Sequence, residues 1–156
     1  MYCEDCVPIR ELSRNKADNI IDQLYLGDMK IAGTFDGLRL CVHEHGPQYD
    51  GQCFLIPILT KRPFSKWDRT GATASIEKLD ECAELIETHV NKGNKLLVHC
   101  FGGIERSPLT IAWWMVKTKR ADNIEDAYKF LQSKRPAVSE RLFWLPRDHE
   151  WFQEIP

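Results

Sequence analysis

Long hydrophobic runs and an excess of positive charge are both missing from this sequence. No segment approaches the roughly 20 consecutive apolar residues that cross a bilayer, and the N-terminus lacks the basic and then apolar order of a signal peptide. The 156 residues carry a formal net charge of −2 and have a pI near 6.2, whereas proteins that bind nucleic acid or anionic membranes usually carry a basic excess. We therefore expect a cytoplasmic protein with no nucleic-acid or membrane partner, and the oligomeric state stays open.

Internal repeats and low-complexity segments are absent as well. A chain of this length can bury one hydrophobic core and has little room for a second domain. We expect an N-terminal tail at residues 1–17, one folded domain at residues 18–150 and a short C-terminal end at residues 151–156.

Six cysteines are present, and without an export signal we expect reduced thiols rather than a disulfide framework. They are Cys3, Cys6, Cys41, Cys53, Cys82 and Cys100. The pair Cys3 and Cys6 would need further ligands to bind zinc, and the candidates are Cys41, His43, His45 and Cys53. One such pair is weak support for a metal site, so we expect no metal and no cofactor.

One short segment combines a thiol, a glycine-containing loop and a cation. Residues 96–98 predict a buried strand, Cys100 and Arg106 follow around two glycines, and Ser107-Pro108 predicts the N-cap and first position of a helix. In a strand, loop and helix arranged in this way, the loop N–H groups and the positive end of the helix dipole converge on one point. The segment therefore predicts a phosphate-binding loop, which we call the nucleophile loop (residues 100–106).

The residue types in this loop suit chemistry on phosphate. A helix N-terminus and a nearby arginine favour the thiolate form of cysteine, so Cys100 is the expected nucleophile. Arg106 offers a planar fork that binds two phosphate oxygens and stabilises the charge that develops in the transition state. A lysine could not bind both oxygens in this way.

Hydrophobic periodicity predicts an α/β domain. Strands are expected at residues 20–26, 38–42, 53–58 and 95–99, and helices at 76–90, 108–119 and 123–135. Gly93 is expected to end the first helix, and Ser139 to cap a last helix that Pro146 stops. The order strand, helix, strand favours parallel pairing. We therefore expect a single domain with a central, mostly parallel twisted sheet flanked by helices, with the nucleophile loop at the carboxyl end of a strand.

The segment from His99 to Pro108 resembles the signature of the Cys-dependent protein tyrosine phosphatases, and most of all their dual-specificity branch. Residues 20–27 resemble the opening strand of that branch, residues 56–58 its central strand and residues 134–136 the end of its penultimate helix. The resemblance implies a dual-specificity phosphatase-like fold with a helical C-terminal third. It also implies a protein phosphatase that forms a phosphocysteine intermediate. Its substrate would be a phosphorylated protein or peptide, with phosphotyrosine first and phosphoserine or phosphothreonine depending on the depth of the pocket.

The resemblance also implies roles for four residues. Asp68 would be the general acid, and Ser107 would help the thiolate to leave in the second step, in addition to its cap role. His99 would order the loop, although a hydrogen-bonded core histidine fits the sequence equally well. Cys41 would capture an oxidised Cys100 as a disulfide, but a small buried side chain is the favoured alternative there.

Asp68 is assigned by counting back from Cys100, because the helix between them fixes that distance. Counting forward from residues 56–58 puts Thr60 at the place of the acid, so the intervening loop is longer than is usual in the family. The alternative of an ordinary solvated loop aspartate stays open. Trp67, next to Asp68, either lines the mouth of the cleft or packs against the domain.

The nucleophile loop also bears on the choice of substrate. Phosphate is expected to lie against Phe101, Gly102, Gly103, Ile104, Glu105 and Arg106. Because Arg106 is the only cation among these, RNA 5′ ends and phosphoinositides are less favoured, although Lys61, Arg62, Lys66 and Arg69 could add charge from the long loop. Glu105 is expected to point away from phosphate and to hold Arg106 or another neighbour.

Two further classes remain as alternatives. A rhodanese-like sulfur transferase or arsenate reductase also uses a cysteine in an anion-binding loop, but it needs neither Asp68 nor Ser107. A silent phosphoprotein-binding module usually loses the cysteine or the arginine, and this chain keeps both.

Overall fold

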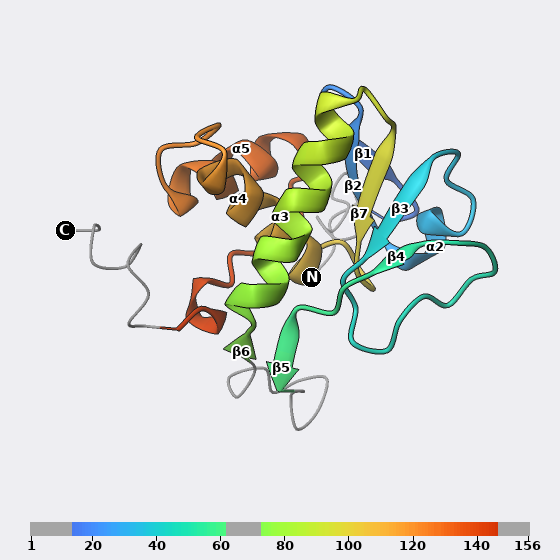
Figure 1. The fold of residues 1–156 in the computed structure, drawn as a ribbon, viewed down its shortest axis with the longest axis horizontal. Coiled ribbons are helices and arrows are strands. Elements are labelled where there is room, and N and C mark those ends of the chain that lie inside the picture. The colour runs from blue at the N-terminus through green and yellow to red at the C-terminus, as the bar shows by residue number, and fades with distance from the viewer. Residues whose placement is uncertain (1–13, 62–72, 147–156) are drawn as a thin grey trace, which may run out of the picture.

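A five-stranded sheet with the order β1-β2-β7-β3-β4 lies at the centre of the computed structural model, which describes residues 14–61 and 73–146 (Figure 1). The strands are β1 (Ala17–Ile21), β2 (Leu24–Gly27), β3 (Leu38–Cys41), β4 (Phe54–Leu55) and β7 (Leu96–His99). Strands β2, β7, β3 and β4 pair in parallel, and β1 joins the edge antiparallel to β2. The expected mostly parallel sheet is confirmed, and β7 leads directly into the nucleophile loop.

The single strand expected at residues 20–26 is wrong, because the chain turns there and forms the hairpin of β1 and β2. Asp22 adopts a positive φ of 51°, which aspartate tolerates better than most residues. The Asn19 side chain donates a hydrogen bond of 2.8 Å to the Asp22 carbonyl and so stabilises the turn. Local turn chemistry therefore divides a run that reads as one strand.

The strand expected at residues 53–58 is shorter and lies at the edge of the sheet rather than at its centre. The Ile56 N–H still donates to the Cys41 carbonyl at 3.0 Å, but Pro57 has no N–H with which to continue the ladder. The chain then enters a small antiparallel sheet of β5 (Leu59–Lys61) and β6 (Thr73–Ala74).

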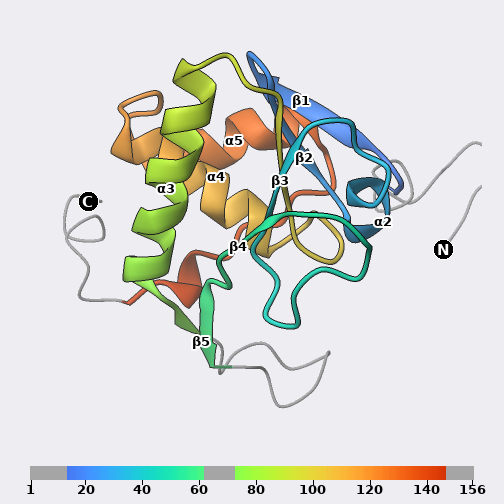
Figure 2. The same cartoon turned by 45° about the vertical axis from the view of Figure 1, so that its right-hand side comes forward.

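Three long helices cover one side of the central sheet, and a short helix lies on the other side (Figures 1 and 2). The long helices are α3 (Ile76–Asn91), α4 (Arg106–Lys117) and α5 (Ile124–Lys134), and the short one is α2 (Met29–Ala32). Ser75 caps α3, and Gly93 follows its end with a φ of 74°, as expected for a helix stop. Asn123 caps α5 through a hydrogen bond from the Asp126 N–H, which confirms that prediction.

The last helical segment differs from its prediction. It is a 3-10 helix, η1 (Leu142–Trp144), and Ser139 does not cap it. The Ser139 N–H instead donates to the Ile104 carbonyl at 2.9 Å. The segment after α5 therefore supports the nucleophile loop.

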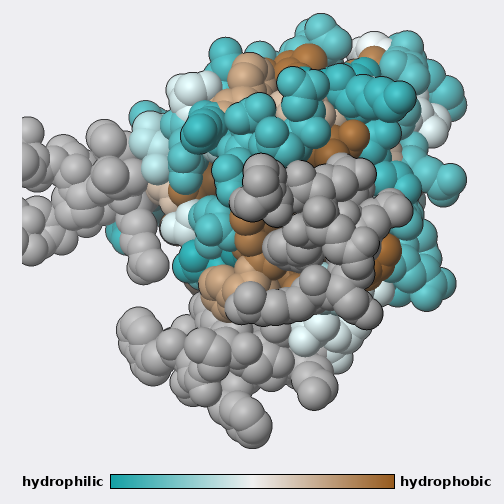
Figure 3. All heavy atoms as spheres, turned by 90° about the vertical axis from the view of Figure 1, so that its left-hand side faces the viewer, coloured by the Kyte–Doolittle hydropathy of each residue, from teal (hydrophilic) through white to brown (hydrophobic). Residues whose placement is uncertain are grey.

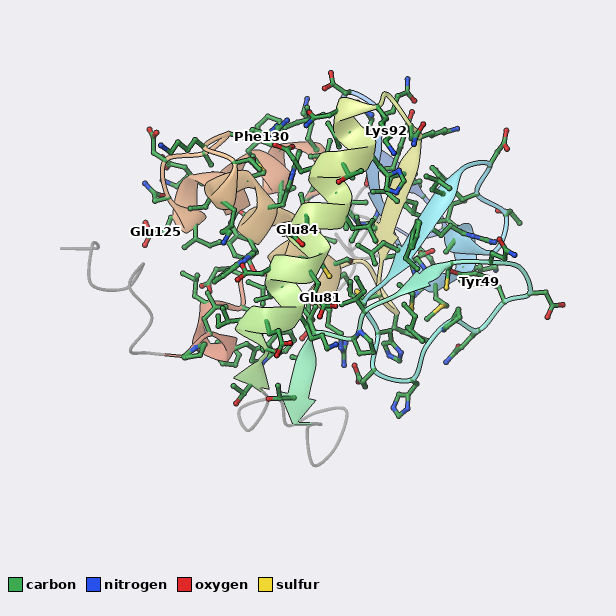
Figure 4. All side chains as sticks on the ribbon, in the orientation of Figure 1. Tyr49, Glu81, Glu84, Lys92, Glu125 and Phe130 are labelled. Atoms are coloured by element: carbon green, nitrogen blue, oxygen red, sulfur yellow. The ribbon has the colours of Figure 1, made fainter. Side chains whose placement is uncertain are left out.

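The core lies between the sheet and the long helices and contains three fully buried tryptophans, Trp113, Trp114 and Trp144. Glu81 and Glu84 project from the outer face of α3 (Figure 4). Hydrophilic residues cover most of the described surface on the side seen in Figure 3. No helix in the described residues is both long and apolar enough to cross a bilayer.

Candidate active site

The Cys100 thiol lies at the bottom of the nucleophile loop, between the end of β7 and the start of α4. Its sulfur accepts a hydrogen bond from the Gly103 N–H at 3.3 Å and lies 3.2 Å from the Ser107 hydroxyl oxygen. The cysteine is only 1% exposed. The Gly103 N–H and the Ser107 hydroxyl therefore face the sulfur at the N-terminal end of α4, where a helix favours negative charge.

Ser107 does not cap α4, which corrects the sequence prediction. The N-cap position is Glu105, whose side chain makes no cap hydrogen bond, and Ser107 lies within the first turn. Its hydroxyl is fully buried and faces Cys100 instead of a backbone N–H. Pro108 also lies inside the first turn rather than at its first position.

Gly103 allows the loop to pass close to the end of β2. It has a φ of 67°, and a Cβ atom there would lie 2.5 Å from the Gly27 carbonyl oxygen and 2.8 Å from Arg135 Nη2. At Gly102, by contrast, the nearest atom to a Cβ would be in the Ile104 side chain at 3.4 Å. The two adjacent glycines therefore differ, because only Gly103 is required by the shape of the loop.

Arg135, which follows α5, clamps the back of the loop. Its Nε donates to the Gly103 carbonyl at 2.9 Å and its Nη2 to the Gly102 carbonyl at 3.2 Å. Its Nη1 reaches the Lys16 carbonyl at 3.2 Å and the Asp18 carboxylate at 2.9 Å. One fully buried side chain therefore connects the nucleophile loop to the segment that contains β1.

Arg106 is paired with Glu44, a residue of the connection between β3 and β4. Arg106 Nη2 donates to Glu44 Oε1 at 2.7 Å, and Nε lies 2.7 Å from Oε2. Burial alone would raise the pKa of the Glu44 carboxyl. A hydrogen bond from its own backbone and the Arg106 guanidinium outweigh burial and hold that pKa below its usual value.

His99 connects the loop to Tyr49, which also belongs to the connection between β3 and β4 and is labelled in Figure 4. Burial, the largest cause, lowers the pKa of His99 to about 4, so the ring is neutral near pH 7. Nδ1 lies 3.1 Å from the Cys100 carbonyl oxygen and Nε2 lies 2.8 Å from the Tyr49 hydroxyl. We assign the proton to Nδ1, which donates to the carbonyl, so that Nε2 accepts from Tyr49. Burial also raises the pKa of Tyr49, which keeps its hydroxyl protonated and able to donate.

A cleft of about 1230 Å³ opens above this loop, with Cys100 and Arg106 among its lining residues. Two of its other lining residues are well exposed aromatics, Phe101 at 59% and Phe143 at 47%. The cleft is therefore large enough for an organic group attached to a phosphate.

Charged side chains of both signs line this cleft. Arg14 and Lys30 contribute positive charge, which favours an anionic ligand. Glu105 Oε2 lies 3.1 Å from Arg141 Nε, so this loop carboxylate is held by a neighbour, as expected.

Cys41 is buried on the strand next to β7, where it pairs in register with His99. Burial is the main cause that raises the pKa of its thiol to about 11, with smaller contributions from Cys53 and Cys100. A protonated thiol reacts slowly, so a disulfide between Cys41 and Cys100 stays a prediction.

Several other predicted positions lie outside the described residues, namely Cys3, Cys6, Arg62, Lys66, Trp67, Asp68 and Arg69. The general acid and the cysteine pair therefore remain predictions. Among residues 14–61 and 73–146, no group of three or more His, Cys, Asp or Glu side chains is arranged to hold a metal ion.

Sequence reasoning missed Glu44, Tyr49 and the clamp made by Arg135. A signal existed for Glu44, because it follows a predicted strand and polar residues at the carboxyl ends of parallel strands meet at one edge of a sheet. Nothing local marked Tyr49, which reaches His99 from 50 positions away.

Comparison with known families and proteins agrees with this geometry. A family model described as the dual specificity phosphatase catalytic domain matches residues 51–146, well over half of the chain. Protein 123R of Invertebrate iridescent virus 6 is 35% identical over 60 residues, which cover 38% of this chain and 42% of the viral protein. Human dual specificity protein phosphatase 5 is 31% identical over 84 residues, which cover 53% of this chain and 22% of that protein. The chain therefore spans less than half the length of these curated relatives.

Solved structures share the fold at low sequence identity. The human tyrosine phosphatase-like serine/threonine/tyrosine-interacting protein matches with a TM-score of 0.65 and 16% identity, over 84% of this chain and 91% of that one. The structure of DUSP15 matches with a TM-score of 0.62 and 18% identity, over 83% of each chain.

Proposed function

Because this chain belongs to the dual specificity phosphatase catalytic domain family, we propose that it is a protein phosphatase that uses Cys100 as its nucleophile. It removes phosphate from tyrosine, and also from serine or threonine where these shorter side chains reach the thiol. The observation that carries this proposal is the Cys100 sulfur between the Gly103 N–H and the Ser107 hydroxyl, in a loop that leads into α4 and Arg106.

The reaction proceeds in two displacements. In the first, the Cys100 thiolate forms a bond to phosphorus while the bond from phosphorus to the leaving oxygen breaks, and Asp68 protonates that oxygen. In the second, Asp68 takes a proton from water, which attacks phosphorus and releases the thiolate as inorganic phosphate forms. The Ser107 hydroxyl stabilises the departing thiolate, and Arg106 binds the phosphate oxygens in both steps.

The test is hydrolysis of para-nitrophenyl phosphate across pH by the native chain and by Cys100→Ser and Asp68→Asn. We expect Cys100→Ser to be inactive. We expect Asp68→Asn to lose about two to four orders of magnitude in kcat together with the basic limb of the pH profile. An alkyl phosphate should be measured in parallel, because its poorer leaving group needs the acid more.

Asp36→Asn is the matched control, since Asp36 is exposed and is not among the described residues that line the cleft. It should keep native kinetics. An inactive native chain would contradict the proposal, and turnover of thiosulfate instead would indicate a sulfur transferase. If Asp68→Asn behaves like Asp36→Asn on both substrates, the general acid is another residue.

A further inference from the structure

Glu105 brings a negative charge into the loop that is proposed to bind phosphate, and Arg141 lies against it. We propose that Arg141 is a positioning residue that holds the Glu105 carboxylate at the side of the cleft, so that the carboxylate does not compete with phosphate. This inference rests on the proposed function, because it concerns the same phosphate site.

The place of Glu105 in the chain explains why it needs to be held. It directly precedes Arg106, is the N-cap residue of α4 and lines the cleft together with Cys100. Its side chain makes no cap hydrogen bond. A helix N-terminus favours negative charge, and here a carboxylate and the expected phosphate share one such end. A Glu105 side chain without a partner of its own would therefore weaken phosphate binding.

Arg141 supplies that partner from outside the loop. Its Nε lies 3.1 Å from Glu105 Oε2, and the two side chains are 24% and 13% exposed. Water screens a pair that is mostly buried less than it screens a pair on the open surface. The guanidinium therefore offsets the charge of the carboxylate and fixes where it lies.

The neighbours of Arg141 hold it in position. Its N–H donates to the Tyr128 hydroxyl at 3.3 Å, and its Nη1 donates to the Glu140 carbonyl at 2.8 Å. Its guanidinium carbon lies 5.9 Å from the centre of the Phe143 ring. A side chain that is already ordered loses little conformational entropy when it pairs with Glu105. The cation is therefore in place before phosphate arrives.

The fold brings the two residues together although they are 36 positions apart. The segment after α5 runs alongside the loop, because the Ser139 N–H donates to the Ile104 carbonyl at 2.9 Å. Two residues after Ser139, Arg141 reaches Glu105, which follows Ile104. The segment that supports the loop therefore also supplies the cation.

The other carboxylate among the described residues that line the cleft is held in a comparable way. Asp28 Oδ1 accepts from the Ile31 N–H at 2.8 Å, and Oδ2 accepts from the Asn15 N–H at 2.7 Å. With both carboxylates engaged by donors, the positive charge of Arg14 and Lys30 remains for an anionic ligand.

Two other roles for Arg141 give different predictions. A direct phosphate ligand weakens binding whenever it is removed, whatever residue stands at position 105. An ion pair that only supports the loop weakens binding when either partner is removed. A positioning role predicts opposite signs, because Arg141→Gln releases the carboxylate whereas Glu105→Gln eliminates its charge.

The measurement is protection of Cys100 from iodoacetamide by increasing concentrations of inorganic phosphate, which needs no turnover. We expect Arg141→Gln to raise the half-protecting concentration on the order of tenfold and Glu105→Gln to lower it about threefold, since a like charge beside an anion site costs affinity. With para-nitrophenyl phosphate, Arg141→Gln should raise KM and leave kcat unchanged, because a competing carboxylate weakens the ground state and the transition state alike. A loss of folded protein alone would lower apparent kcat and leave KM unchanged.

A double-mutant cycle tests whether Arg141 acts through Glu105. In the Glu105→Gln background, Arg141→Gln should raise the half-protecting concentration by less than about threefold. If Arg141→Gln does not fold, the cycle is measured with Arg141→Lys, which lacks Nε. Its loss of protection should be smaller than that of a neutral side chain and should likewise shrink in the Glu105→Gln background.

Arg120→Gln is the matched control, because Arg120 pairs with Glu87 at 2.8 Å and is 26% exposed, close to the 24% of Arg141. It should leave protection and KM as in the native chain.

Three results overturn the inference. They are an equal loss of protection from Arg141→Gln in both backgrounds, weaker phosphate binding by Glu105→Gln, and a native chain that phosphate does not protect. A native chain that shows the expected opposite signs but hydrolyses no phosphate ester would overturn the proposed function and leave this inference standing.

Discussion

At the scale of single residues, the nucleophile loop contains two neighbouring glycines with different constraints. Gly103 has a positive φ and lies against the Gly27 carbonyl and the Arg135 side chain. A Cβ atom at Gly102 would meet only the Ile104 side chain, at 3.4 Å and 3.7 Å. The sequence presents both as parts of one flexible pair, but only the structure separates them.

We predict that Gly103→Ala destabilises the protein by at least about 2 kcal/mol, because a side chain there combines a strained backbone with a clash. It should also abolish protection of Cys100 from iodoacetamide by phosphate, because the clash with Gly27 and Arg135 displaces the loop that would bind the anion. Urea unfolding and iodoacetamide protection measure the two effects. Gly102→Ala is the control and should change stability by less than about 1 kcal/mol. Similar losses in both variants would show that the loop is shaped by something other than Gly103.

At the scale of secondary structure, segments that are distant in sequence support the loop from different sides. The connection between β3 and β4 contributes Glu44 and Tyr49, the end of α5 contributes Arg135, and Ser139 binds the Ile104 carbonyl. The loop itself supplies the thiol and the arginine. The catalytic geometry is therefore a property of several elements together rather than of the signature segment alone.

We predict that Arg135→Met lowers the free energy of unfolding by about 3 kcal/mol, because it leaves two loop carbonyls and the Asp18 carboxylate without their buried donor. It should also weaken phosphate binding, since the loop loses the clamp on Gly102 and Gly103. Urea unfolding and the protection assay measure both.

The matched control is Arg120→Met, because Arg120 forms a partly exposed pair with Glu87 far from the loop. That variant should lose no more than about 1 kcal/mol and should bind phosphate as the native chain does. Equal losses of stability in the two variants would mean that Arg135 contributes no more to stability than a partly exposed ion pair does.

At the scale of the whole molecule, the burial of the site makes folding stability depend on pH. His99 has a pKa of about 4 in the folded protein against 6.5 for an unperturbed histidine. Between these values the unfolded chain binds a proton that the folded chain does not. Stability therefore rises with pH through this window and falls as the solution is acidified from pH 6.5 toward pH 4.

We predict that acidification from pH 6.5 to pH 4 lowers the free energy of unfolding by at most about 3 kcal/mol through His99. His99→Asn should remove this contribution. Urea unfolding at intervals between pH 7 and pH 4 measures the slope for both proteins. The native slope should be the steeper of the two. Parallel slopes would mean that the folded state accommodates the charged imidazole.

The sequence predicts the parts of this protein that depend on local patterns. The strand, glycine-containing loop and helix around Cys100 are marked by adjacent residues, and α3 is marked by its apolar period and by Gly93. Local patterns fail where side chains have two suitable partners, as for Ser107, which faces the Cys100 sulfur instead of capping α4. They also fail at Asp22, where a turn residue interrupts an apolar run.

Contacts between distant positions could not be predicted from the sequence. Arg106 and Glu44 are 62 positions apart, and no composition or period connects them. Arg135 was recognised only as the end of a helix, because its partners are backbone carbonyls, which every residue carries.

The clamp made by Arg135 also has a consequence for how the protein is made. Arg135 is synthesised 32 positions after Gly103, whose carbonyl it binds. It also binds the Lys16 carbonyl, which is synthesised 119 positions before Arg135. A nascent chain that already displays the complete signature around Cys100 therefore still lacks the side chain that holds its loop in shape. Such long-range closure is slow compared with the formation of helices. The thiol is accordingly synthesised before the contacts that shape its loop can form, and completion of the site waits for the segment that follows α5.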